Sequence, residues 1–290
     1  MNETNPTLPQ KPITFKKKFP LEKGELIAFL STETGFSKSL LKKLLTNGAV
    51  WFTKANGGKR QRVRRATFEL FQGAIVELFY DPKFLDIEIP APVLLKDTKE
   101  WGIWFKPAGL LSQGNNFGDQ ASIERIVEKT KGKAFLLHRL DREAQGLMLF
   151  AYNEKSARIF SEKFQKRTIK KFYEIEVVGD MTKEQPMSGD IEFELDGKSA
   201  KTSYTILSVQ NTDELVTTKV AVEIHTGRLH QIRRHFAMLD FPVYGDPKYG
   251  KNNKNSDGMR LRATKLEFKD PYTQSWIVAE LNDENTLKQA

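Results

Sequence analysis

Short apolar runs separated by turns recur along the chain from residue 101 onward, and their spacing limits the folds that it can adopt. Alternation within these runs is typical of strands, which we expect at residues 101–105, 135–139, 147–151, 172–178, 202–209, 220–225, 261–268 and 276–280. Most neighbouring runs are joined by turns rather than by crossover helices, so most strands should be antiparallel. The pattern predicts an α+β fold with a mixed, mostly antiparallel sheet.

Two helices are expected among these strands. Asn153 is a suitable N-cap for the first, whose buried face would carry Ala157, Phe160 and Phe164. The second should run from about residue 228 to 238, with an apolar stripe made of Leu229, Ile232, Phe236 and Leu239. Arg233 would then lie beside this stripe, at the edge of the core.

The first 80 residues predict a smaller unit built around one helix. Ser37 is a suitable N-cap and Gly48 a suitable end for this helix, which carries an inward stripe of leucines at positions 40, 41, 44 and 45. A short strand is expected at residues 49–52, and a hairpin at residues 68–80 around Gly73. This order, with its lysine-bearing helix and Asn-Gly-x-Val step, resembles the small S-four-like RNA-binding domain over about residues 20–80.

The positive charge of the chain is concentrated in this unit. The 290 residues carry a net charge of +9, and residues 1–80 hold 14 Lys and Arg against 6 Asp and Glu. A basic appendage on a near-neutral body is typical of proteins that bind nucleic-acid phosphates, although a solvated surface would give the same count. The candidate RNA-binding cations are Lys38, Lys42, Lys43, Arg60, Arg62 and Arg64.

Prolines mark the boundary between the two parts. Pro82, Pro90 and Pro92 indicate a linker at residues 81–92. We therefore expect a disordered tail at residues 1–12, a small basic domain at residues 13–80, and a catalytic domain at residues 93–290.

The composition excludes several kinds of chemistry. The chain has no cysteine, so disulfides, thiolate metal sites and cysteine nucleophiles are excluded. His225, His230 and His235 are five residues apart, a spacing that does not bring them together on a helix, so no metal is expected and a metal-dependent hydrolase is a weak alternative. The N-terminal dozen residues lack the apolar segment of a secretion signal, and no later run is long enough to span a bilayer, so we expect a cytoplasmic protein.

Two polar clusters interrupt apolar runs in the catalytic part and are the candidates for chemistry. The first is His138-Arg139-Leu140-Asp141, which lies between two predicted strands. A carboxylate in that position needs a cation nearby, because an unpaired buried charge is costly. The second cluster runs from His225 to His235, and its Arg233 is placed to supply that cation.

These clusters belong to an ordered set of motifs that resembles the RluA-type family of RNA pseudouridine synthases. The set comprises HRLD with Gly146, Lys171-Phe172-Tyr173, TGRLHQIRRH and PVYGDPKYG, with smaller echoes at KPAGL (106–110), GKSAKT (197–202) and residues 261–268. The resemblance spans about residues 100–280. It implies a pseudouridine synthase fold with a sheet split by a central cleft.

The resemblance also implies roles for individual residues. Asp141 would be the essential aspartate, Arg233 its salt-bridge partner and Tyr173 the aromatic residue that packs on the target base. Arg139 would fill the gap left in the RNA by the extruded nucleotide, and Leu261 would form a wall of the pocket. The other candidates for substrate binding are His138, Arg228, His230 and Gln231. No metal or organic cofactor is implied, the expected partner is ribosomal or transfer RNA, and a monomer is the expected state.

The chemistry of the isomerisation suits these residues. Pseudouridine formation breaks the bond from ribose to N1 of uracil, turns the base and rejoins it through C5. A carboxylate can attack the sugar, attack the base or remove a sugar proton, and the sequence leaves all three routes open. The base must leave the RNA stack to react, and Tyr173 would face inward with Ile175 and Val177 to receive it.

The chain departs from the family pattern at two places. Ala144-Gln145 stands where the family usually has Thr-Ser, and Arg262 stands where a histidine is common. The loss of two hydroxyls beside Asp141 is the one feature that favours the alternative of a non-catalytic RNA-binding protein on the same scaffold.

Overall fold

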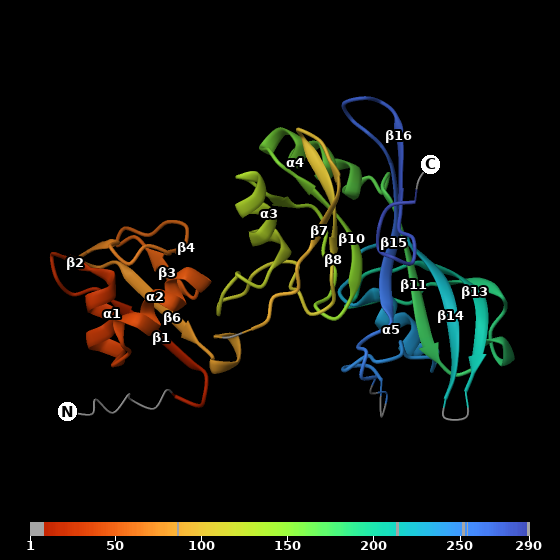
Figure 1. The fold of residues 1–290 in the computed structure, drawn as a ribbon, viewed down its shortest axis with the longest axis horizontal. Helices are drawn as coiled ribbons and strands as arrows, with labels where there is room; N and C mark the ends of the chain where they lie inside the picture. Colours follow the sequence, from red (N-terminus) through yellow and green to blue (C-terminus); the bar gives the residue numbers. More distant parts are fainter. Residues whose placement is uncertain (1–8, 86, 213–214, 251–252, 254, 289–290) are drawn as a thin grey trace. The chain divides into compact units, whose positions relative to one another are not determined.

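The described residues of the chain divide into two units. The structure is a computed structural model that describes residues 9–85, 87–212, 215–250, 253 and 255–288 (Figure 1). The first unit combines the described residues up to Ile89 with Gln113–Ile126, and the second combines Pro90–Ser112 with the described residues from Val127 onward. Among the described residues, no helix has the length and apolar character needed to cross a membrane.

The first unit is a small α+β structure. Its elements are β1 (Ile13–Lys18), β2 (Lys23–Glu25), α1 (Leu26–Thr34), α2 (Lys38–Asn47), β3 (Val50–Thr53), β4 (Gln61–Arg62), β5 (Glu69–Phe71), β6 (Ile75–Tyr80) and η1 (Pro82–Phe84). The strands form an antiparallel sheet in the order β1-β6-β3-β4, and β2 pairs separately with β5. The helix and strand that the sequence predicted near residues 38–52 are confirmed as α2 and β3.

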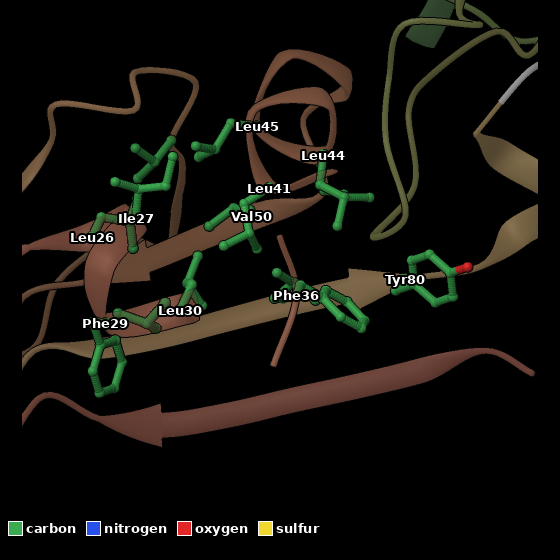
Figure 2. Packing of buried hydrophobic residues seen from close by; sticks show 14 of the residues in the cluster. Leu26, Ile27, Phe29, Leu30, Phe36, Leu41, Leu44, Leu45, Val50 and Tyr80 are labelled. Carbon is green, nitrogen blue, oxygen red and sulfur yellow. The ribbon is translucent and has the colours of Figure 1, made fainter. Parts of the chain in front are cut away.

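The core of this unit is apolar. The Ser37 side chain accepts a hydrogen bond from the Leu40 N–H, and Gly48 ends α2 in the left-handed conformation, as expected. The leucine stripe of α2 packs with α1, β3 and β6, and Figure 2 shows Leu41, Leu44 and Leu45 with Val50 in this cluster. The hydrophobic cluster stabilises α1 and α2, because isolated helices of this length are only marginally stable in water.

The hairpin predicted at residues 68–80 is wrong. Gly73 does make a turn with positive φ, but β5 pairs with β2 whereas β6 pairs with β1 and β3. The Gly73 N–H donates to the carbonyl of Phe19, on a different segment. Long-range partners therefore separate two strands that local sequence would have joined.

The second unit is built on one large sheet. Its elements are β7 (Val93–Asp97), β8 (Trp101–Lys106), the end of α3 (Ile123–Lys131), β9 (Phe135–Leu136), β10 (Gln145–Ala151), α4 (Glu154–Gln165), β11 (Lys170–Val178), η2 (Met181–Lys183), β12 (Ser188–Ile191), β13 (Thr202–Asn211), β14 (Val216–Ile224), α5 (Gln231–Met238), β15 (Leu261–Lys269) and β16 (Trp276–Glu280). The strand order is β12-β13-β14-β11-β15-β10-β8-β7, with β16 on β15 and β9 on β10. Figure 1 shows how these strands lie side by side.

The predicted mixed, mostly antiparallel sheet is confirmed. The single parallel pair among the described strands joins β10 to β15, through Gln145 with Arg262 and Gly146 with Ala263. Gly146 has φ +124°, and a Cβ there would collide with the backbone of Ala263. Glycine is thus required for the close approach of two strands next to the Asp141 loop, and not only for a turn.

Local signals placed α4 correctly. The Asn153 side chain accepts a hydrogen bond from the Ser156 N–H, and Phe160 is fully buried against Trp101 and Phe268. Phe164 packs on the edge of the same cluster.

Two predicted boundaries needed correction. The strand expected at residues 135–139 stops at Leu136, because the Leu149 N–H of β10 donates to the imidazole of His138 instead of continuing the ladder. The helix expected from residue 228 begins at Gln231, because His230 adopts a left-handed conformation (φ 52°) that no α-helix contains. Leu229 therefore precedes the helix and is 57% exposed, so it is not part of the buried stripe.

Candidate active site

Asp141 lies in a short loop between β9 and β10 that is held from several directions. The Ser112 hydroxyl donates to the Leu140 carbonyl at 2.6 Å, and the Leu140 N–H donates back to that hydroxyl at 2.9 Å. The Gly109 N–H donates to the Arg142 carbonyl at 2.8 Å. These bonds fix the residues on both sides of Asp141, although Ala144 and Gln145 contribute no hydroxyl.

Lys106 supports the same loop from the core. The sequence analysis did not identify it as a functional residue. Its ammonium group is fully buried and donates to the carbonyls of Pro107, Leu110 and Arg142 at 3.0, 2.7 and 3.3 Å. Burial lowers the pKa of Lys106 to about 7, against the opposing attraction of Glu143 and Asp141. The sequence signal was present in the KPAGL segment, because a lysine at the end of an apolar strand needs acceptors.

Arg233 meets Asp141 as the sequence predicted. Its Nη1 lies 2.8 Å from Oδ2 of Asp141, and the arginine side chain is 3% exposed whereas that of Asp141 is 23% exposed. The partial exposure of Asp141 leaves the carboxylate accessible to solvent and to a substrate.

Asp246 holds Arg233 in this orientation and is the main addition that the structure makes to the site. Its two carboxylate oxygens accept hydrogen bonds from Nε and Nη2 of Arg233 at 2.7 and 2.8 Å, and Oδ1 also accepts the N–H groups of Lys248 and Tyr249. The bidentate pair fixes the plane of the guanidinium. Only Nη1 is then left to point at Asp141.

The electrostatic balance of this group favours its charged form. Burial opposes the charge on Arg233, but the hydrogen bonds that it donates to Asp246 and Asp141 outweigh this effect and raise the pKa of the arginine. Burial likewise raises the pKa of Asp246, but the hydrogen bond from Arg233 and those from two backbone N–H groups leave it below the usual value. One cation therefore lies between two carboxylates, and Glu143 approaches Arg233 at 3.9 Å.

Tyr173 lies on the inward face of β11, as predicted, together with Ile175 and Val177. It is 6% exposed, and burial together with the neighbouring Asp141 raises the pKa of its phenol, so the hydroxyl stays protonated. Leu261 is opposite Ile175 in the adjacent strand β15 and is also buried. An aromatic ring and apolar side chains thus accompany the carboxylate.

His230 approaches Asp141 from the start of α5. Its Nε2 lies 3.7 Å from Oδ1 of Asp141, and its Nδ1 lies 3.0 Å from the hydroxyl of Tyr249. Burial lowers the pKa of His230. These two contacts explain the left-handed backbone at this residue, which local sequence could not reveal.

Gln231 and Arg228 fasten the loop before α5 to the neighbouring strands. The Gln231 side chain accepts bonds from the Thr226 hydroxyl and the Arg228 N–H, and it donates to the carbonyl of Lys201 and the hydroxyl of Thr202. The Arg228 Nε donates to the Ser199 carbonyl at 3.0 Å. Gln231 is buried and uses its amide within the fold.

His138 and Arg139 are adjacent but differ in surroundings. The His138 ring accepts the Leu149 N–H at 2.9 Å, and burial, followed by repulsion from Lys171, lowers its pKa to about 3, so it is neutral. Arg139 is exposed and has no hydrogen bond or ion pair to any residue that the structure describes. A free guanidinium two residues from Asp141 can reach a bound molecule.

The three spaced histidines do not converge on one point. His225 contacts the Ser203 hydroxyl at 2.7 Å, His230 contacts Tyr249, and His235 contacts the Phe193 carbonyl at 3.4 Å. No cluster of His, Asp and Glu in the described part of the chain has a geometry suited to a metal ion.

The six candidate RNA-binding cations of the first unit fall into two groups. Lys38, Lys42 and Lys43 are exposed on α2. The arginines are engaged within the unit: Arg60 with Glu77, and both Arg62 and Arg64 with Asp119. The guanidinium groups of Arg60 and Arg62 each lie 4.0 Å from the centroid of the Trp51 ring. The three lysines are thus exposed to solvent, whereas the three arginines are held in ion pairs within the unit.

Comparison with known proteins gives a consistent result. The sequence profile of the family described as RNA pseudouridylate synthase matches residues 101–238. An uncharacterized RNA pseudouridine synthase of Aquifex aeolicus (strain VF5) is 31% identical over 289 aligned residues, which cover 87% of this chain and 88% of that protein. The dual-specificity RNA pseudouridine synthase RluA of Pasteurella multocida (strain Pm70) is 35% identical over 190 residues, which cover 59% of this chain and 84% of that protein.

Solved structures agree on the fold. The structure of human RNA pseudouridylate synthase domain containing 1 superposes with a TM-score of 0.58 at 19% identity, and the match covers 71% of this chain and 93% of that one. The region matched by the family profile contains Asp141, Tyr173 and Arg233.

Proposed function

Because the chain belongs to the RluA-type family of RNA pseudouridine synthases, which isomerise uridine within RNA, we propose that Asp141 is its catalytic carboxylate and that Arg233 positions it. The observation that supports this proposal most directly is the Asp141–Arg233 ion pair of 2.8 Å, in which the arginine is buried and the carboxylate remains partly exposed. A structural ion pair alone would not require an accessible acid next to an aromatic wall.

The reaction itself sets what the site must do. The glycosidic bond from C1′ to N1 breaks, a bond from C1′ to C5 forms, N1 gains a proton and C5 loses one, so the atoms of the nucleotide are conserved. Asp141 acts on the detached state by one of the three routes open to a carboxylate. Arg233 keeps the carboxylate aimed, because its own orientation is fixed by Asp246.

The remaining residues have roles in holding the base and the RNA. Tyr173 packs against the uracil that has left the stack, and Leu261 limits its movement as it turns. The exposed Arg139 enters the space that the extruded nucleotide leaves in the RNA. Gln231, whose amide bonds within the fold, and His138, whose Nε2 accepts the Leu149 N–H, shape the site from the side of the core.

We further propose the partner and the setting. The substrate is a folded ribosomal or transfer RNA, which the first unit binds through Lys38, Lys42 and Lys43 in the manner of an S-four-like domain. Arg60, Arg62 and Arg64 support that surface through their own contacts. The protein acts as a monomer, without metal or organic cofactor, in the cytoplasm.

A comparison of pseudouridine maps tests the proposal. Ribosomal and transfer RNA from cells with and without the gene are mapped, and RNA from the deleted strain is then treated with the purified protein. We expect at least one uridine to lose its modification on deletion and to regain it on treatment. Identical maps, together with unchanged RNA after treatment with protein that binds it, would contradict the proposed activity.

A further inference from the structure

A basic groove lies in the second unit at the start of β11, the strand that also carries Tyr173. Its volume is about 450 Å³, and it is bounded by the end of α4, the start of β11 and the loop that follows β14. The charged side chains that line it are Arg167, Lys170, Lys171, Lys201, Arg228 and the single acid Glu223. Five cations against one carboxylate make this groove suited to an anion.

The cations of the basic groove differ in how they are paired. Lys201 forms ion pairs with Asp190 and Glu192, each at 2.6 Å. Arg167, Lys170 and Lys171, in contrast, form no ion pair with any acid that the structure describes. The groove therefore contains positive charge that the fold itself does not neutralise.

Lys171 is the most constrained of these groups. Its ammonium group lies 5.9 Å from the centroid of the Phe164 ring, and a Cβ added at Gly227 would be 3.9 Å from its Nζ. Burial, followed by repulsion from Arg167, lowers the pKa of Lys171, so the surroundings of this ammonium group disfavour its charge. A bound anion would supply the missing partner.

The position of the basic groove relates it to the reaction. Lys171 precedes Tyr173 by two residues on β11, so both side chains lie on the same face of the strand, roughly 7 Å apart along it. Gly227 and Arg228 belong to the loop that leads into α5 and Arg233. The elements that hold the base-binding tyrosine and the positioning arginine thus also form the groove.

We propose that the basic groove binds a backbone phosphate of the RNA immediately beside the extruded uridine, with Lys171 as its principal contact and Arg167 at its rim. This inference rests on the proposed function, because it assigns a subsite for the same RNA. A phosphate held there fixes the ribose of the target nucleotide while the base turns against Tyr173. This assignment accounts for the absence of an acidic partner for Lys171 among the described residues, since such a partner would compete with the phosphate.

The test measures RNA binding and turnover separately. Lys171→Met keeps the length of the side chain and removes its charge, Lys171→Arg keeps the charge, and Lys155→Met removes a charge from the exposed face of α4, outside the groove. RNA from a strain that lacks the gene is used to measure Kd by filter binding at several salt concentrations, and KM and kcat by pseudouridine formation.

We expect Lys171→Met to raise Kd and KM by roughly tenfold or more, and to reduce the slope of log Kd against log salt by about one. Lys171→Arg should restore most of the affinity, and Lys155→Met should match the wild type. Arg167→Met, at an exposed position where folding is not at risk, should raise Kd about threefold with a smaller change in slope.

Several outcomes would overturn the assignment. Unchanged Kd and KM in both Lys171→Met and Arg167→Met would remove the basic groove from RNA binding. Saturable binding of inorganic phosphate that is lost in Lys171→Met, with RNA affinity unchanged, would assign the groove to a free phosphate. If the wild type binds RNA but forms no pseudouridine, the proposed function fails while the Kd comparison still decides the phosphate subsite.

Discussion

The two units of the molecule treat buried charge in opposite ways. The first unit is stabilised by an apolar cluster of α1, α2 and the strands around them, and its Arg60 and Arg64 form ion pairs that stay partly exposed. Among the described residues, the buried charged side chains Lys106, Arg233, Asp246 and Asp270 all belong to the second unit. The unit that carries the proposed chemistry is therefore the one that removes ions from water.

The difference indicates what the buried charges are for. Desolvation of an ion pair often costs as much as its attraction returns, so stability alone does not account for the group around Arg233. Its geometry does, because Asp246 binds two nitrogens of the guanidinium and leaves the third for Asp141. In the second unit, burial of these charges costs stability but fixes the orientation of Arg233 toward Asp141. The first unit has no comparable group among the residues that the structure describes.

Asp141→Asn tests whether the charged group of the second unit serves catalysis, and it should have the largest effect. The substitution preserves size and can still accept a hydrogen bond from Arg233, so the fold should survive, but the carboxylate needed by every open route is gone. We expect pseudouridine formation to fall by more than about 1000-fold, with RNA binding changed little. Mass-spectrometric mapping of treated RNA measures the loss, and an active Asn variant would reduce the charged group to a structural role.

Asp246→Ala compares the two units directly. It leaves two nitrogens of a buried arginine without their partner, so we expect the free energy of unfolding to fall by about 3–5 kcal/mol and activity to fall with it. Glu33→Ala is the matched change in the first unit, where Lys17 and Glu33 pair at 2.6 Å near the surface, and it should cost less than about 1 kcal/mol. Urea denaturation measures both, and equal losses would show that the distinction between the units is wrong.

Lys106→Met tests how a buried charge of the second unit changes the pH dependence of stability. The pKa of Lys106 is lowered by burial to about 7 in the folded state, from 10.5 in a solvated chain. Between these values the unfolded chain binds more protons, so Lys106 makes the wild type more stable as the pH rises from about 7 toward 10.5. The variant should lack this gain in stability. Unfolding curves at pH 7 and pH 9 measure the change in unfolding free energy of both proteins. An equal change in the wild type and the variant would show that the Lys106 ammonium group does not cause the pH dependence.

Local signals in the sequence predicted those parts of the fold that depend on neighbours along the chain. The Ser37 and Asn153 caps, the helices that they begin and the alternation of β11 were all correct, because capping and strand alternation act within a few residues. The proximity of Asp141 to Arg233 was also predicted, since an acid between two core strands requires a cation.

The remaining features depend on contacts between distant segments. The start of α5 is displaced because His230 is held between Asp141 and Tyr249, and no local rule contains that pair. The bidentate contact of Asp246 with Arg233 could not be predicted from the sequence. Asp246 follows Gly245 in a segment that is equally typical of a simple turn, and Asp141 alone already accounted for the charge of Arg233. The hairpin at residues 68–80 failed for the same reason, since β2 and β3 offer better partners than the adjacent strand.

The smallest expected effect concerns the surface of the first unit. Lys38 and Lys42 are exposed on α2, so replacing both by Gln should leave the apolar core and the unfolding free energy unchanged within about 0.5 kcal/mol. If α2 contacts RNA phosphates, Kd should rise by a few fold at moderate salt and the slope of log Kd against log salt should fall by one to two. The control is Lys16→Gln/Lys18→Gln, which removes the same charge from strand β1 of the same unit. Equal effects of the two double variants would mean that the first unit attracts RNA by net charge alone, whereas a loss confined to α2 would identify the helix as the contact surface.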